Sequence, residues 1–221
     1  MLKILFSPQW FYGKDIVIDI FSIIVLTLIA IFSLKYYKIN KKQNHLWFAI
    51  SFATLAIAFL FKILTNFTIY YKIINTETLG ILTLSYETIH ASDILFTIGF
   101  LFYIFLSLTS LFILYEIYQK KHSKQNIIII LFFIATTTYF TTSKYFLFHL
   151  TSFFLLILIT RNYYKNNSSK ILTTSFTIIT ISQLFFIFIT INPIFYVTAE
   201  IIQFVGYILL LTTFIGVIKN A

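Results

Sequence analysis

A carboxylic acid, Glu200, lies inside an apolar stretch that is long enough to cross a bilayer, residues 194–217. Tyr196, Gln203 and Tyr207 accompany it at offsets that place all four side chains on one face of a helix. An ionisable group within a membrane-spanning helix is costly to expose to lipid, so it usually faces other helices or a hydrated space. The stripe therefore indicates a buried polar surface, with Glu200 as its chemically active member.

The composition indicates what surrounds such a helix. Of the 221 residues, 59% are hydrophobic and only 10% are charged, and the mean hydropathy is +0.92. Soluble domains carry about 25% charged residues, and here most charges lie between apolar runs rather than within them. We infer an integral membrane protein that forms a single domain over residues 1–221.

The formal net charge of +9 comes from lysines that cluster in short segments beside the apolar runs. In that position lysines act as topology signals and as contacts for anionic lipid headgroups. The lipid bilayer is therefore the expected partner, and nucleic acid is not. The chain has no cysteine, which excludes disulfides, thiolate nucleophiles and cysteine-ligated metals.

Seven apolar runs divide the chain, and the predicted fold is an all-α bundle of seven transmembrane helices. A helix needs about 20 residues to cross the hydrocarbon core of a bilayer. The fourth and fifth runs are shorter, so they form either two short spans or one re-entrant hairpin. Residues 66–93 are predicted to form an outer loop that carries an interfacial helix or a lid. The predicted spans cover residues 16–36, 46–65, 94–115, 127–141, 145–160, 171–190 and 194–217.

The distribution of basic residues orients this bundle. With the N-terminus outside, 11 of the 16 Lys and Arg residues fall at the inner side and the other 5 at the outer side. Short cytoplasmic loops carry the excess of Lys and Arg in membrane proteins. We therefore expect an N-out, C-in topology, with the cell (plasma) membrane as the location.

In this topology, polar side chains from several spans fall at a similar depth in the outer half of the bundle. His149 in the fifth span lies at about the depth of Glu200, and Lys62 lies near the outer end of the second. We predict that these groups meet in an outward-facing polar cavity. Its predicted lining is Asp19, Lys62, His149, Gln183, Glu200, Gln203 and Tyr207.

A purely structural explanation of the same residues stays open. Asp19 and Lys62 can extend along their helices to the membrane interface, and Ser and Thr hydroxyls can bond to carbonyls of their own helices. Glu200 can be a buried carboxyl, protonated or paired with Lys62, that fixes helix packing.

No catalytic motif accompanies these residues. The chain lacks Gly-x-Ser-x-Gly, His-Glu-x-x-His and Gly-x-x-x-x-Gly-Lys-[Ser/Thr], so we expect a protein that is not an enzyme. His149 is the one histidine well inside a predicted span, and a haem held between spans needs two axial ligands. No ligand spacing supports a metal site, so neither a metal nor another cofactor is expected.

Seven spans with an external N-terminus resemble the gross layout of microbial rhodopsins. Those proteins carry a retinal-binding lysine in the middle of the last span, where this chain reads Val197-Thr198-Ala199-Glu200-Ile201. The resemblance is limited to topology and does not imply retinal.

The leading functional expectation is a receptor- or sensor-like membrane protein. Its outer cavity would bind a small polar ligand or a proton, Glu200 would be the charge that changes on binding, and the basic inner loops would bind a protein partner. One alternative is a small-solute or proton-coupled transporter or channel, whose inner path Thr173 and Thr177 would help to line. The other is a structural or accessory subunit of a larger membrane complex.

Overall fold

The structure, a computed structural model, describes residues 7–78, 82–117, 144–165 and 169–219, and it describes side chains for 7–8, 10–68, 95–117, 145–165 and 169–216. All regular elements in these ranges are helical. They are the 3₁₀ turn η1 (Gln9–Phe11), α1 (Lys14–Asn40), α2 (Gln43–Thr78), α3 (Leu82–Glu116), α5 (Lys144–Lys165), α6 (Lys170–Ile187), the 3₁₀ turn η2 (Phe188–Thr190) and α7 (Ile194–Lys219).

Six of the described helices are long and apolar enough to cross a membrane. Each covers one of the predicted spans, with the span 171–190 running from α6 into η2, so the all-helical, multi-pass membrane character expected from composition is confirmed. The predicted span 127–141 lies outside the described residues.

Two local features differ from the sequence expectations. The fifth span is not short, because α5 continues past Thr160 through Arg161 to Lys165 and has 22 residues. The residues predicted as an outer loop, 66–93, are mostly helical, since α2 runs on to Thr78 and α3 begins at Leu82. No proline or glycine lies between Gln43, where α2 begins, and Gly80, so no helix-breaking residue ends α2 at the membrane boundary.

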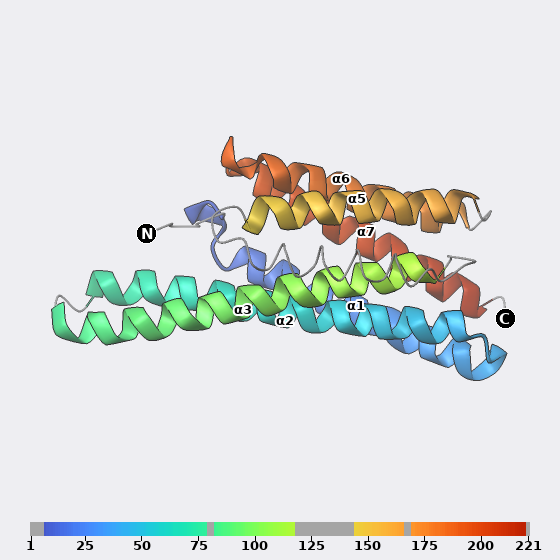
Figure 1. Ribbon diagram of the computed structural model, residues 1–221, viewed down its shortest axis with the longest axis horizontal. Helices are drawn as coiled ribbons and strands as arrows, with labels where there is room; N and C mark the ends of the chain where they lie inside the picture. Colours follow the sequence, from blue (N-terminus) through green and yellow to red (C-terminus); the bar gives the residue numbers. More distant parts are fainter. Residues whose placement is uncertain (1–6, 79–81, 118–143, 166–168, 220–221) are drawn as a thin grey trace, which may run out of the picture.

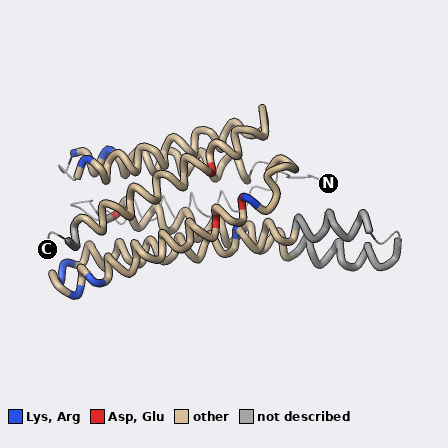
Figure 2. The backbone as a smooth tube through the Cα atoms, turned by 180° about the vertical axis from the view of Figure 1, so that it is seen from behind, with Lys and Arg blue, Asp and Glu red and all other residues tan. Residues whose placement is uncertain are grey.

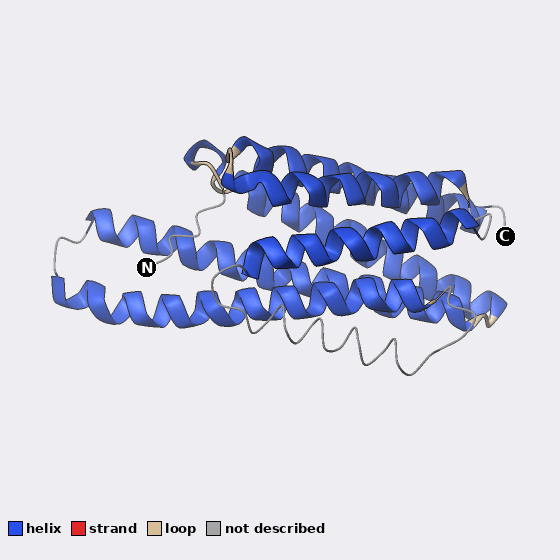
Figure 3. Ribbon diagram, turned by 45° about the horizontal axis from the view of Figure 1, so that its top comes forward, coloured by secondary structure: helices blue, strands red, loops and turns tan. Residues whose placement is uncertain are grey.

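The helices form two layers that close into a ring (Figures 1 and 3). In one layer α1 packs on α2 and α2 on α3; in the other α5 packs on α6 and α6 on α7. Contacts between α3 and α5 on one side, and between α1 and α7 on the other, join the layers. The ring therefore has an interior that every described helix can reach.

Helices α3 and α5 run in the same direction (Figure 1). Phe100 of α3 lies 6.5 Å, ring centroid to centroid, from Tyr145 of α5, and Tyr103 lies 5.2 Å from Phe148. The later residue of the α3 pair thus contacts the later residue of the α5 pair, as parallel helices require. The end of α3 and the start of α5 therefore lie at opposite ends of the bundle.

One end of the bundle is basic (Figure 2). The tight turn between α1 and α2 lies there, and Lys41 ends α1 in the left-handed conformation, with φ of 54° and its N–H donated to the carbonyl of Tyr37. This is a common way to end a helix, although it favours glycine over lysine. The basic end carries Lys35, Lys38, Lys41, Lys42, Arg161, Lys165 and Lys170.

Two glycines allow close helix contacts. A Cβ at Gly206 of α7 would lie 2.5 Å from the side chain of Ile179 on α6, and a Cβ at Gly99 of α3 would lie 2.8 Å from Oγ1 of Thr65 on α2. Both positions therefore need glycine for the observed helix spacing. The close α6–α7 approach brings Gln183 and Gln203 to the same side of the ring interior.

Candidate functional site: a buried ion cluster and a neighbouring cavity

Three charged side chains from three helices meet in the interior. The ammonium of Lys62 on α2 donates to Oδ1 of Asp19 on α1 at 2.7 Å and to Oε1 of Glu200 on α7 at 2.5 Å. All three residues are buried, with Asp19 0%, Glu200 1% and Lys62 8% exposed. We call these residues the ion cluster; it links one layer of the ring to the other.

The helix faces of the three elements explain how the sequence builds the cluster. On α1, Asp15, Asp19 and Ser22 are spaced to share one face, and all three are buried. On α2, Asn66 follows Lys62 by one turn and donates to Oδ2 of Asp15 at 3.4 Å. The polar contact between α1 and α2 therefore extends one helical turn beyond the ion cluster.

The charges of the ion cluster do not balance. Two carboxylates face one ammonium, and Oδ2 of Asp19 has no hydrogen-bond partner among the described residues. An uncompensated charge in a low-dielectric interior is costly. The cluster becomes neutral when one proton binds to its carboxylates, and the unpartnered oxygen of Asp19 is an available position for that proton.

Aromatic rings lie beside the ion cluster. The Nζ atom of Lys62 is 5.2 Å from the centroid of the Phe59 ring, within cation–π distance. The Phe59 ring in turn lies edge-on to Tyr103 and Tyr207, at centroid distances of 6.3 and 5.8 Å. These rings form an apolar layer next to the ammonium.

His149 and Gln183 form a separate, uncharged pair between α5 and α6. Nδ1 of His149 lies 2.7 Å from Oε1 of Gln183, and both side chains are buried. Since an amide oxygen only accepts, the imidazole Nδ1–H donates. The ring stacks on Phe186 at 4.5 Å and lies 4.2 Å from Tyr145, while its Nε2 has no hydrogen-bond partner among the described residues.

A third polar group lies along α7. Nε2 of Gln203 donates to the hydroxyl of Tyr207, one turn further on, at 2.9 Å. Tyr196, at the other end of the same stripe, packs edge-on against Phe11 and Phe186 instead. The polar stripe that the sequence indicates is thus divided among an aromatic contact, the ion cluster and this hydrogen-bonded pair.

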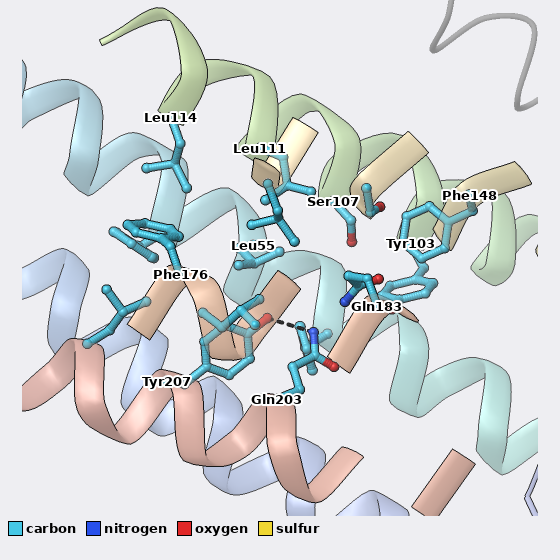
Figure 4. A pocket seen from close by; sticks show the side chains of 16 residues that line it. Leu55, Tyr103, Ser107, Leu111, Leu114, Phe148, Phe176, Gln183, Gln203 and Tyr207 are labelled. Carbon is cyan, nitrogen blue, oxygen red and sulfur yellow. Dashed lines mark hydrogen bonds between the residues drawn. The ribbon is translucent and has the colours of Figure 1, made fainter. Parts of the chain in front are cut away.

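A cavity of about 30 Å³ lies in the ring interior (Figure 4). Three groups from the predicted list line it, and so do two serines, Ser107 and Ser152. Figure 4 shows Gln183, Gln203 and Tyr207 around the space with Ser107 across from them. The rest of the lining is apolar: Phe52, Leu55, Phe59, Leu111, Leu114, Phe148, Leu156, Phe176, Ile179 and Leu210, with Tyr103 beside them.

The seven predicted residues are therefore all buried, and three of them line the central cavity. Gln183, Gln203 and Tyr207 line the central cavity, whereas Asp19, Lys62 and Glu200 contact one another beside it. His149 does not line the cavity itself but contacts two residues that do, Gln183 through a hydrogen bond and Phe148 through its ring.

The threonine stripe of α6 does not add to this site. The hydroxyls of Thr173, Thr177 and Thr180 each bond to the carbonyl of the residue four positions earlier on their own helix. Thr177 is also exposed on the outside of the bundle. The inner polar path that these residues suggested is not formed by them.

Two cavity residues on α3, Tyr103 and Ser107, have no counterpart in the sequence-based list. Together with Ser110 and Leu114 they follow the spacing of one buried helix face, and all four are buried. Their helical spacing could have identified this face from the sequence, but the pattern is weak because α3 is apolar on every side. Ser110 is instead part of the contact with α2, where its hydroxyl and that of Ser51 bond reciprocally to each other's carbonyls at 2.9 Å.

Among the described residues, no three His, Asp or Glu side chains come together in a group that could hold a metal ion. The acidic groups of the ion cluster are bridged by a lysine. Comparisons of the chain with protein-family models, with curated proteins and with solved structures give no match, so the ion cluster and the cavity are what functional inference rests on.

Proposed function

We propose that this protein is a receptor- or sensor-like membrane protein, not an enzyme, whose ion cluster binds and releases a proton. The observation that carries the proposal is the contact of one ammonium, Lys62, with two buried carboxylates, Asp19 and Glu200. Proton binding changes the net charge of the cluster between −1 and 0. Because the three groups come from α1, α2 and α7, that change acts directly on the contact between the two layers.

A change of charge biases a helix arrangement only if the two arrangements differ in proton affinity. The proposed mechanism meets this condition. With the proton bound, the neutral cluster is stable in a dry interior. Without it, the extra negative charge favours an arrangement in which Asp19 or Glu200 gains water, and this requires α1 and α7 to separate locally.

The proposal includes the N-out, C-in layout with seven spans in the cell membrane. The parallel direction of α3 and α5 supports a further crossing between them. The basic end, with Lys and Arg at or beside the ends of α1, α5 and α6, supports its assignment to the inner side. The small polar ligand or proton then comes from the outer side, and the basic end is the proposed surface for a protein partner.

Infrared difference spectroscopy between acidic and neutral buffer tests the proton site. We expect the carbonyl band of a protonated carboxyl to appear in the wild type and to be lost in both Asp19→Asn and Glu200→Gln. Glu116→Gln, at the basic end of α3, is the matched control and keeps the band. A wild-type spectrum without a titrating carboxyl band, or one that survives both substitutions, refutes the proton site.

Spin-label distances test the sensor. The chain has no native cysteine, so Asn40→Cys and Asn162→Cys report only the separation of the α1 and α5 ends at the basic side. We expect this distance to change with pH in the wild type and to stay constant in a Glu200→Gln background. A proton site without any distance change indicates that the cluster serves packing alone.

A proton-coupled transporter is the second candidate, and one observation favours it. Phe59 connects the two polar regions, because its ring lies 5.2 Å from Nζ of Lys62 and the residue also lines the cavity. Flux of protons into liposomes, abolished by Glu200→Gln, decides for a transporter; the sensor predicts no flux. The back-bonded Thr173 and Thr177 do not support the transporter.

A further inference from the structure

The central cavity contains two hydroxyls that are buried without a partner. Ser107 and Ser152 are 4% and 1% exposed, and neither Oγ atom has a hydrogen-bond partner among the described residues. A buried serine in a membrane helix commonly bonds to a carbonyl of its own helix. Ser175 and Ser182 on α6 do so, each at 2.7 Å.

The two serines lie at matching positions on parallel helices. Ser107 follows Tyr103 by one turn on α3, and Ser152 follows Phe148 by one turn on α5, just as Tyr103 and Phe148 contact each other. Both serines line the same cavity. Their hydroxyls are therefore directed to a shared space instead of to separate packing contacts.

Amide groups complete the polar end of this space. Gln203 uses one N–H on Tyr207, and Gln183 uses its oxygen on His149. A primary amide has two donors and two acceptor lone pairs, so each glutamine retains hydrogen-bonding capacity after these contacts. The cavity thus offers two hydroxyls and two amides to a small molecule that both donates and accepts.

The volume of the cavity limits the size of the molecule that it can hold. A cavity of about 30 Å³ is large enough for about one or two waters, and a buried water needs two to four polar partners. The remaining lining, such as Leu111, Leu156 and Leu210, is apolar and gives water no hydrogen bonds. We propose that the polar end of the central cavity binds one or two waters that bridge Ser107 and Ser152 to Gln183 and Gln203.

The water site is independent of the proton proposed for the ion cluster. Phe59 lines the cavity, and its ring also lies against the ammonium of Lys62. None of the three charged residues is among those that line the cavity. Loss of the waters leaves the proton site in place, and loss of the proton site leaves the waters.

Alanine substitutions distinguish a hydrated cavity from a dry one by the sign of the stability change. If water bonds to the hydroxyls, Ser107→Ala and Ser152→Ala each lower the thermal unfolding midpoint by about 2–4 °C, as loss of a satisfied hydrogen bond does. If the cavity is dry, removing an unpaired hydroxyl leaves the midpoint unchanged or raises it. That outcome overturns the proposal.

Ser175→Ala is the matched control, because its buried hydroxyl bonds only to a carbonyl of its own helix. Such back-bonding does not stabilise a helix, so the loss of this bond is expected to leave the midpoint unchanged. A second measurement needs no stable variant: infrared spectra of the wild type in ordinary and heavy-oxygen water identify internal water by its isotope shift. We expect bands that the double variant Ser107→Ala/Ser152→Ala loses. Their absence in the wild type also overturns the proposal.

Discussion

The ion cluster and the central cavity are neighbouring polar regions that satisfy their polar groups in different ways. In the ion cluster, Lys62 contacts Asp19 and Glu200 directly, and none of the three side chains lines the central cavity. In the cavity lining, the neutral hydroxyls of Ser107 and Ser152 have no hydrogen-bond partner within the described ranges. The charged groups thus bond directly to one another, whereas the two serine hydroxyls of the cavity do not.

The energies of burial explain the difference. An unpaired ionised group in a low-dielectric interior is penalised far more than an unpaired hydroxyl, which costs about 1–3 kcal/mol on mutational scales. Helix packing must therefore bring the charges together, and it can leave hydroxyls to a water. The ion cluster therefore determines how α1, α2 and α7 are positioned, and the cavity is the space that this arrangement leaves between the two layers.

The largest effect is expected when the cation is removed from the ion cluster. Lys62→Met leaves Asp19 and Glu200 buried without a counter-charge, and we expect a loss of about 3–5 kcal/mol in the free energy of unfolding, as for other broken buried ion pairs. Denaturant-induced unfolding in mixed micelles measures it. Lys42→Met, an exposed lysine at the α1–α2 turn, is the control and changes stability by less than about 0.5 kcal/mol.

A triple variant refines this prediction. Adding Asp19→Asn and Glu200→Gln to Lys62→Met removes all three charges, and most of the lost stability is expected to return. If the single Lys62→Met variant is as stable as the wild type, the two carboxylates do not depend on the ammonium, and the contrast between the two regions is wrong.

An intermediate effect is expected in the uncharged region. In His149→Phe the aromatic contacts with Tyr145 and Phe186 can be kept, but the amide of Gln183 loses its partner. We expect a loss of about 1–3 kcal/mol, the usual cost of one unsatisfied buried group. The thermal unfolding midpoint measures this change.

The double variant His149→Phe/Gln183→Leu removes both partners of the pair and recovers part of that loss. Equal stability of the single and double variants would show that Gln183 finds another partner in the cavity, and the two uncharged groups would then not act as a pair.

The smallest effect is expected from salt. Interactions between buried charges are screened much less than those at a surface. The difference in unfolding free energy between wild type and Lys62→Met is therefore expected to stay constant between about 0.1 M and about 1 M salt. Unfolding curves at both concentrations test it, and a difference that shrinks markedly with salt would place the ion cluster in contact with solvent.

Local features of the sequence predict much of this protein. The apolar runs predict the six described spans because about 20 apolar residues are enough to cross a bilayer. The helical spacing predicts that Glu200 faces inward. The directions of the predicted spans place Lys62 and His149 at a similar depth in the membrane. Spans were misjudged where polar residues continue a helix, as in α5 after Thr160 and α2 after Thr65, because membrane helices extend beyond the apolar core.

The sequence by itself determined that polar groups of several helices are buried in a membrane bundle. Only the tertiary structure decided how they combine: Lys62 with both Asp19 and Glu200, His149 with Gln183, and Gln203 with Tyr207. Helix periodicity gives the face and depth of a side chain, but a partner depends on the order and direction of helices around the ring. The close approach at Gly206 and the parallel pairing of α3 with α5 set that order, and neither is encoded in a single helix.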